Sequence, residues 1–363
     1  MWGVRGINLQ RELRTACQVM PNLVSQIHNS KMLILILFPV VIIVLLFIVS
    51  SRPSRLNVAG SHILITGGSS GIGLEIAKEF ARKGGFITLV ARNEQKLLEA
   101  KSIVEQHMKG GGERQCVTIL PLDVASSAKE VLDGIKSTEE RLGPVDYLIN
   151  CAGISFAGTF EDTPTEQFEL LMKVNYFGSI YCTKAVLPGM KKRKKGRIVF
   201  VSSQAGQTGV FGYTAYCPTK FALRGFAETL QMEVKPYNIA VTVSFPPDTD
   251  TPGFHDDDDR KPEETQLISE TSGFFMPDAV GKAIFRDAVR GEFSSTIGLD
   301  GFILGQVTAG MSPCNSMLTA FCQIALMGPF RMVSLAYLKY FDGIVSKCAR
   351  KRECAVQEED KDK

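Results

Sequence analysis

The sequence predicts a doubly wound α/β domain, a parallel sheet with helices on both faces, over residues 58–298. Short apolar runs alternate in this segment with stretches that repeat apolar residues at helical spacing. The runs carry hydrophobic residues at successive positions, as strands do when both faces of the sheet are covered. A glycine-rich turn joins the first run to the first helical stretch, which is typical of such domains.

The elements follow from these patterns in chain order. Strands are expected at residues 61–66, 86–91, 117–124, 145–150, 197–202 and 239–245. Helical periodicity predicts helices at residues 74–83, 131–142, 167–190 and 216–233. The polar stretch 252–273 is expected to be a loop, and its four aspartates at 256–259 fit a solvated charge run.

Residues 32–51 are predicted to form a membrane anchor, preceded by an N-terminal extension at 1–31. No charge interrupts this run, which lies between Lys31 and Arg52. As a helix it is long enough to cross a hydrocarbon core of about 30 Å. A cleaved signal peptide is the alternative, but the run is longer than a usual signal core and lacks a clear small-residue cleavage site.

Residues 299–338 form a second apolar region, predicted to be membrane-associated helices. No charged residue lies between Asp300 and Arg331, but Pro313 and Asn315 divide the region into two stretches. Each is short for a full crossing, so a membrane hairpin, an interfacial segment and a pair of dimer helices all stay open. A homo-oligomer is therefore compatible with the sequence. Residues 339–363 are basic and then acidic, which predicts a cytosolic tail.

Composition excludes other classes of protein. A net charge of +3 over 363 residues provides no strong basic field, and no nucleic-acid recognition motif occurs, so nucleic acid is not an expected partner. The nine cysteines are scattered without metal-ligand spacing, which favours reduced thiols and no metal site.

Residues 66–73 read T-G-G-S-S-G-I-G between a predicted strand and a predicted helix. Glycines let the backbone approach a ligand closely, and a helix N-terminus presents free N–H groups to a pyrophosphate. The turn therefore predicts a dinucleotide site. Its expected contact residues are Gly67, Ser69, Ser70, Gly71, Ile72 and Gly73.

The end of the second strand indicates which dinucleotide is bound. An acidic residue there would accept hydrogen bonds from the ribose hydroxyls of NAD, but this chain has Arg92, followed one helical turn later by Lys96. Cations at this place suit a 2′-phosphate. We therefore expect the cofactor to be NADPH and the reaction to be a reduction.

Tyr216 and Lys220 are four residues apart at the start of a predicted helix, which places both side chains on one face. Alone, this spacing is most often an ordinary surface pair, so its meaning depends on the rest of the chain.

Together these residues resemble the short-chain dehydrogenase/reductase superfamily over residues 58–298. The matching motifs are T-G-G-S-S-G-I-G (66–73), L-D-V (122–124), N-C-A-G (150–153), V-N-Y-F-G (174–178), V-S-S-Q-A-G (201–206) and Y-C-P-T-K (216–220). The resemblance implies a Rossmann-type fold in a single domain and an oxidoreductase that uses a nicotinamide dinucleotide. Cys151 and Pro247 depart from the usual asparagine and glycine of the family.

The resemblance also assigns roles to matching positions. Tyr216 is expected to protonate the substrate carbonyl oxygen, and Lys220 to stabilise the phenolate and bond the cofactor ribose. Ser203 is expected to polarise that oxygen, with Ser202 as second choice, and Asn175 to hold a water that relays protons to Lys220. The remaining expected cofactor contacts are Asp123, Val124, Asn150 and Thr251.

Longer stretches are similar to the branch of this superfamily that reduces keto-sphingoid bases. They lie at 201–216, 231–238 and 246–254 and accompany the apolar N-terminal anchor. The similarity implies NADPH-dependent reduction of a long-chain keto-sphingoid base, 3-ketosphinganine, to sphinganine at the cytosolic face of the endoplasmic reticulum membrane. One aspartate of 256–259 receiving the substrate ammonium group is the less favoured interpretation of that run. The extension 1–31 departs from the branch, whose anchors begin close to Met32.

Two other functions stay open. A membrane-bound hydroxysteroid or retinoid dehydrogenase would share every catalytic residue of this branch. A catalytically silent nucleotide-binding scaffold at the membrane belongs to another class, and the complete set of Ser203, Tyr216, Lys220 and Asn175 argues against it.

Overall fold

The computed structural model describes residues 55–108 and 116–359, together with Val40 and Val44. The predicted extension (1–31) and, apart from these two valines, the predicted anchor (32–51) lie outside the described residues. The chain divides into two units, 1–51 and 52–363, and every element described below belongs to the second.

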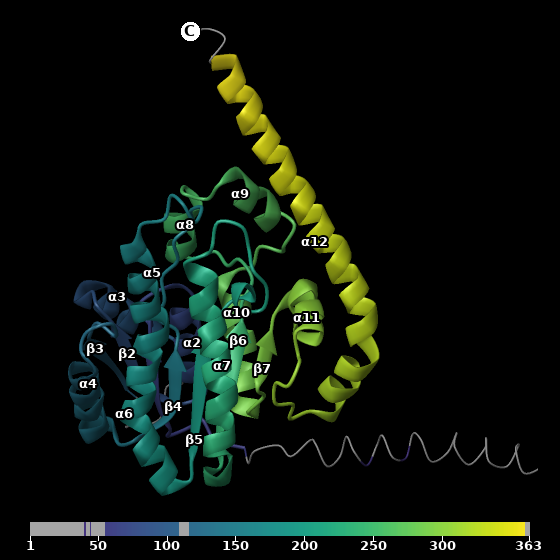
Figure 1. The fold of residues 1–363 in the computed structure, drawn as a ribbon. Coiled ribbons are helices and arrows are strands. Elements are labelled where there is room, and N and C mark those ends of the chain that lie inside the picture. Colours follow the sequence, from purple (N-terminus) through teal and green to yellow (C-terminus); the bar gives the residue numbers. More distant parts are fainter. Residues whose placement is uncertain (1–39, 41–43, 45–54, 109–115, 360–363) are drawn as a thin grey trace, which may run out of the picture. The chain divides into compact units, whose positions relative to one another are not determined.

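A seven-stranded parallel sheet forms the centre of this unit, with the strand order β3-β2-β1-β4-β5-β6-β7 (Figure 1). All six strand pairings are parallel, so the doubly wound prediction is confirmed. The strands are β1 (His62–Thr66), β2 (Phe86–Ala91), β3 (Val117–Pro121), β4 (Val145–Asn150), β5 (Gly196–Val201), β6 (Ile239–Phe245) and β7 (Ser294–Thr296). The short β7 has no counterpart among the predicted strands, and β3 ends three residues earlier than expected.

Helices cover both faces of the sheet because side chains alternate between two cores along each strand. In β1, Ile63 and Ile65 pack into one core and Leu64 into the other. The first core takes residues from α2 (Gly71–Arg82), α3 (Glu94–Glu105) and α10 (Pro277–Arg290). The second takes residues from α4 (Ala128–Leu142), α6 (Gly178–Arg193) and α7 (Tyr216–Val234).

The predicted helix at 167–190 is confirmed as a helical stretch, but a π-helical segment interrupts its α-helical geometry. The chain forms α5 (Thr165–Leu171), then a π-helical segment at Met172–Phe177, and then α6. A π-helical turn widens a helix locally and often marks a functional place. Here the turn carries Asn175, whose side chain bonds to the backbone of Ile154. That tertiary contact is absent from any helical pattern.

The predicted loop at 252–273 is also wrong, since it contains α8 (Pro252–Asp258) and α9 (Glu263–Ser269). The Thr251 hydroxyl caps α8 by accepting from the Phe254 N–H at 3.2 Å. Proline follows this cap at the first helical position, where its missing N–H costs nothing. Helices as short as these two lack the long apolar period by which helices are predicted.

The apolar region forms α11 (Gly298–Val307) and the start of α12 (Met317–Glu359). The expected break near Pro313 and Asn315 separates them. Helix α12 runs for 43 residues, through the predicted boundary at 338/339 between apolar helices and tail, and lies beside α11 (Figure 1). Among the described residues it is the one helix long and apolar enough to cross a membrane, over 317–355.

Candidate active site

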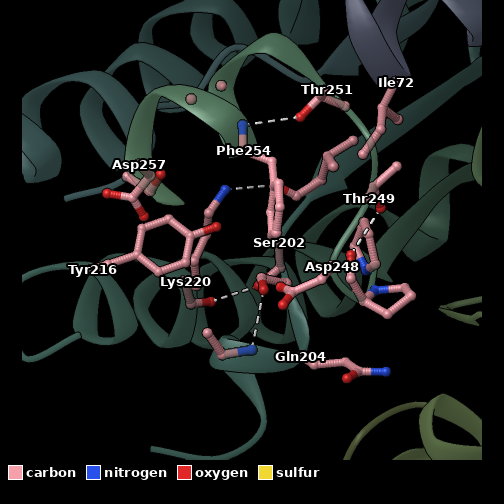
Figure 2. Close-up of a pocket in the computed structure, with 18 of the residues that line it drawn as sticks. Ile72, Ser202, Gln204, Tyr216, Lys220, Asp248, Thr249, Thr251, Phe254 and Asp257 are labelled. Atoms are coloured by element: carbon pink, nitrogen blue, oxygen red, sulfur yellow. Dashed lines mark hydrogen bonds between the residues drawn. The ribbon is translucent and has the colours of Figure 1, made fainter. Parts of the chain in front are cut away.

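A cavity of about 670 Å³ opens at the carboxyl edge of the sheet (Figure 2). Parallel strands bring the residues that follow them to this edge. The first or second residues after β1, β2, β4, β5 and β6 all line it: Gly67, Arg92, Cys151, Ser202 and Pro246. The predicted site residues that line it are Gly67, Ser69, Ser70, Gly71, Ile72, Gly73, Arg92, Lys96, Asp123, Val124, Ser203, Tyr216, Lys220 and Thr251.

The glycine-rich turn is built for close backbone packing. Gly67 has φ +65°, and a Cβ there would lie 2.9 Å from backbone atoms of Ala152. A Cβ on Gly73 would lie 2.3 Å from the Gly67 carbonyl oxygen, and one on Gly71 2.9 Å from the Thr251 methyl group. No side chain fits at these positions, so the turn stays thin beside the cavity.

The N-terminus of α2 lines the cavity with Gly71, Ile72 and Gly73. Ser70 precedes the helix, and within the described chain its hydroxyl makes no capping bond to it. The first N–H groups of a helix lack partners inside the helix, and its dipole is positive at this end. The thin turn and the uncapped N–H groups together fit the pyrophosphate of a dinucleotide.

Two cations lie at the outer part of this cradle. Arg92 and Lys96 line the cavity with exposed side chains, and neither forms an ion pair within the described residues. The Asn93 side chain caps α3 by accepting from the Lys96 N–H at 2.9 Å, which holds this turn in place. Their charges are therefore available to a second anionic group of the ligand.

Tyr216, Lys220 and Ser203 converge on the inner part of the cavity. Tyr216 begins α7, and Lys220 follows one turn later with its ammonium group 5.5 Å from the centre of the Tyr216 ring. Lys220 Nζ donates to the Val201 carbonyl at 3.0 Å at the end of β5. Ser203 hydrogen-bonds the Tyr216 side chain, so the predicted spacing brings phenol, ammonium and hydroxyl together.

Burial shifts both titrating groups toward their neutral forms. It raises the pKa of Tyr216, against the lowering effect of the Ser203 hydrogen bond. It lowers the pKa of Lys220 to about 8, against the raising effect of the Cys151 thiol. The phenol of Tyr216 is thus protonated near neutral pH. The neighbouring Lys220 ammonium group has a pKa of about 8, only slightly above neutral pH.

The two neighbouring serines point to different partners. The Ser202 hydroxyl is buried and donates to the Lys220 carbonyl at 2.9 Å, which ties α7 to the end of β5. The Ser203 hydroxyl accepts from the Ala205 N–H at 3.1 Å and also meets Tyr216. Of the pair, Ser203 is the one bonded to the phenol.

Asn175 and Asn150 lie behind the cavity wall, not on it. Asn175 Oδ1 accepts from the Ile154 N–H at 2.8 Å, and its Nδ2 donates to the Ile154 carbonyl at 2.9 Å and to Thr219 Oγ1 at 3.0 Å. Asn150 Nδ2 reaches Thr183 Oγ1 at 3.4 Å. Asn175 therefore fixes the segment that follows β4, whereas Asn150 joins the end of β4 to α6. A water relay through Asn175 stays a prediction.

Two carboxylates also line the cavity: Asp248, which sequence reasoning missed, and Asp257, for which contact with the substrate was the less favoured interpretation. Asp257 is 2% exposed, accepts from the Ala157 N–H at 2.8 Å and from the Tyr213 hydroxyl at 2.9 Å. Burial raises the pKa of Asp248, against the lowering effect of Lys261. Figure 2 shows Asp257 beside Tyr216, and Asp248 next to Ser202. The favoured interpretation of 256–259 as solvated is therefore wrong for Asp257. In a run of four aspartates, no local pattern distinguishes the buried one.

Throughout the described ranges, histidine, cysteine and carboxylate side chains form no group of three or more suited to a metal ion.

Comparisons with known proteins agree with this geometry. The sequence pattern of the short chain dehydrogenase family matches residues 61–262. A Danio rerio protein named 3-dehydrosphinganine reductase is 52% identical over 324 residues, 89% of this chain and 97% of that protein. A Bos taurus protein named 3-ketodihydrosphingosine reductase is 52% identical over 85% of this chain and 93% of its own. The crystal structure of an NAD⁺-bound xylitol dehydrogenase shares the fold, with a TM-score of 0.58 and 24% identity over 64% of this chain and 94% of that one.

Proposed function

Because the chain belongs to the short-chain dehydrogenase family, we propose that it reduces the ketone of 3-ketosphinganine to sphinganine, a step of sphingolipid biosynthesis. The observation that carries the proposal is the 52% identity with reductases of that name over almost their whole length. An oxidoreductase with a nicotinamide cofactor and a lipid substrate follows from the family and these relatives.

NADPH is the proposed cofactor. The cradle formed by the glycine-rich turn and the start of α2 fits the pyrophosphate, and Arg92 and Lys96 lie where a 2′-phosphate would be neutralised. When bound, the reduced nicotinamide supplies hydride to the ketone carbon. Thr251 and the residues after β4 are proposed to hold its ring, and Lys220 its ribose.

The chain's own residues handle the proton. Tyr216 donates its phenolic proton to the ketone oxygen as negative charge develops there. Ser203 donates a hydrogen bond to the same oxygen and so polarises it. Lys220, with its charge beside the ring, lowers the free energy of the phenolate left behind. Asn175 holds the Ile154 backbone that packs next to these groups.

Carboxylates beside the phenol favour an amino ketone over a steroid or retinoid. Asp248 and Asp257 line the cavity that holds Tyr216, and buried carboxylates are stabilised by a nearby cation. The ammonium group of a keto-sphingoid base is adjacent to its ketone and would supply one. A neutral steroid would add no cation beside these carboxylates, of which Asp248 has Lys261 as a neighbouring charge in the protein alone.

The proposed location is the endoplasmic reticulum membrane, with the catalytic domain on the cytosolic side. Helix α12 supports membrane attachment because only 6% of its most apolar window is buried. The basic residues near its end, including Lys347, Arg350 and Lys351, favour the cytosolic side.

The direct test of the function is turnover of a substrate panel by the purified full chain with NADPH. We expect reduction of 3-ketosphinganine to sphinganine, identified by mass spectrometry, and slower reduction of an N-acetyl analogue that lacks the ammonium charge. Steroid ketones and retinal should react at least tenfold more slowly. Faster turnover of a steroid would replace the proposed substrate, and no NADPH oxidation with any ketone would favour the silent scaffold.

The cofactor assignment predicts a strong effect of Arg92→Asp. Reversing this charge should weaken NADPH binding at least 30-fold, since it removes a charge-assisted hydrogen bond worth about 2 kcal/mol and adds repulsion. NADH binding should change less than threefold. Affinities come from quenching of nucleotide fluorescence, with Arg82→Asp on the far end of α2 as the control. Equal weakening of both nucleotides would contradict the 2′-phosphate assignment.

A further inference from the structure

The cavity does not end at the catalytic residues. It continues into an arm between α11 and α12, and this α11–α12 arm is lined by Ile303, Leu304, Val307, Val333, Tyr337, Leu338 and Phe341. Tyr216 and the arm belong to the same hollow space. A group bound at the phenol can therefore extend into the arm without leaving the protein.

A second cavity of about 490 Å³ prolongs the arm along α12. It shares four lining residues with the first, namely Val210, Ile268, Leu338 and Phe341. Two of these lie on α12, one on α9 and one on the loop before α7. The two cavities therefore adjoin along α12, and the second has Asp342 and Ser346 beside its apolar residues.

The two ends of the first cavity differ in chemistry. Asp248, Asp257 and Tyr213 give the catalytic end polar and charged walls, whereas most residues that α11 and α12 contribute to the cavity are aliphatic or aromatic, with Asp300, Arg331 and Ser334 as the exceptions. A molecule with one polar head and one aliphatic chain matches this division. The arm is also open on one side, because Val333, Tyr337 and Leu338 keep 40%, 42% and 41% of their side chains exposed.

The open side of the arm is formed by α12, and the solvent-exposed face of this helix is apolar too. Leu318, Phe321, Ile324, Met332 and Leu335 of α12 are all more than half exposed. Exposed apolar residues in such number on one helix indicate contact with lipid. An aliphatic chain leaving a bilayer along α12 would reach the arm without crossing water.

We propose that the α11–α12 arm binds the aliphatic chain of the substrate, while the polar head lies between Tyr216 and Asp248. Helix α12 thus selects substrates by chain length and receives the chain from the bilayer. The inference rests on the proposed function for the identity of the head group. Its physical basis is burial of methylene groups, each worth about fourfold in affinity.

A matched pair of substitutions on α12 tests the arm. Leu338→Trp fills the arm, whereas Leu335→Trp makes the same change one turn earlier at a residue that lines neither cavity and is 51% exposed. The full chain is assayed with NADPH and with keto-sphingoid bases of eighteen and eight carbons. Leu338→Trp should lower kcat/KM at least tenfold for the long base and less than twofold for the short one. Leu335→Trp should change neither by more than twofold.

Other outcomes decide against the arm. An equal loss with both bases, or none with either, in Leu338→Trp and in Leu304→Trp on the opposite wall would overturn the inference. NADPH affinity within twofold of wild type shows that each variant is folded. If wild type reduces neither base, the proposed function fails, and binding of dodecylamine against butylamine then decides. A preference for dodecylamine lost only in the arm variants supports the arm, and equal binding of both amines by wild type overturns it.

Discussion

Tyr216→Phe is expected to lower kcat for 3-ketosphinganine at least 100-fold while NADPH affinity stays within threefold. The substitution keeps the ring and removes the proton donor, and general acid catalysis is worth about 10²–10⁴-fold. Affinity should survive because the aromatic ring that packs at the start of α7 is unchanged. NADPH oxidation gives the rate, and fluorescence titration gives the affinity.

Tyr213 is the sharpest control for this variant. Its ring lies 5.5 Å from that of Tyr216 between centres and lines the same cavity, but its hydroxyl donates to Asp257. Burial and the Asp257 carboxylate raise the pKa of Tyr213, and its hydroxyl proton is held by Asp257, so it is not free to protonate a substrate. Tyr213→Phe should cost less than tenfold in kcat. A larger loss in Tyr213→Phe than in Tyr216→Phe would transfer the acid role to Tyr213.

Lys220→Met is expected to act on rate and stability in opposite directions. It removes the charge that stabilises the phenolate, so kcat/KM should fall at least 100-fold. The lowered pKa of Lys220, about 8, means that folding buries a charge at a cost of about 3 kcal/mol at pH 7. The variant avoids that cost but loses the hydrogen bond to Val201, worth about 1 kcal/mol. The free energy of unfolding without cofactor should therefore be about 2 kcal/mol larger than that of wild type.

The same pKa sets the pH dependence. Since the folded-state pKa lies below that of the unfolded chain, the folded protein binds fewer protons between about pH 8 and pH 10.5, and stability should rise with pH across this window. The rate of reduction should fall above about pH 8, where Lys220 loses its charge. Lys220→Met should show neither slope.

Denaturant titrations and pH–rate profiles measure these effects, with Lys184→Met as the control. Lys184 is exposed on α6, so its replacement should leave both the profile and the free energy of unfolding within experimental error. If Lys220→Met is less stable than wild type at pH 7, the ammonium group stabilises the fold. That result would contradict the lowering of the Lys220 pKa by burial.

The parts of the site that sequence reasoning found are those with short-range signatures. The glycine-rich turn, Arg92 with Lys96, and Tyr216 with Lys220 each occupy a few consecutive residues. A tight backbone turn brings the glycine-rich residues together, and one turn of α-helix places the members of each pair on one face. All of them line the cavity. The same holds for the strands, whose apolar runs are continuous because the sheet is covered on both sides.

The parts that it missed depend on partners far along the chain. The sequence favoured Asp257 as one of four solvated aspartates. In the structure it is buried, and its carboxylate accepts from the Ala157 N–H and the Tyr213 hydroxyl. Asn175, expected to hold a proton-relay water, also bonds to the Ile154 backbone, a contact that the sequence did not indicate. The two short helices in 252–273 are stabilised by a cap on α8 and by packing over the cavity. Neither feature produces a long helical repeat of apolar residues in the sequence.

From residue order alone came the sheet, the dinucleotide turn and the phenol–lysine pair, because hydrogen-bond geometry and helical repeat act over a few neighbours. Packing in three dimensions settled which serine meets the phenol, which aspartates enter the cavity and how α11 and α12 extend it. Desolvation is the physical reason: whether a charge or an apolar wall is buried depends on segments distant in sequence, and no local pattern records which of them will meet.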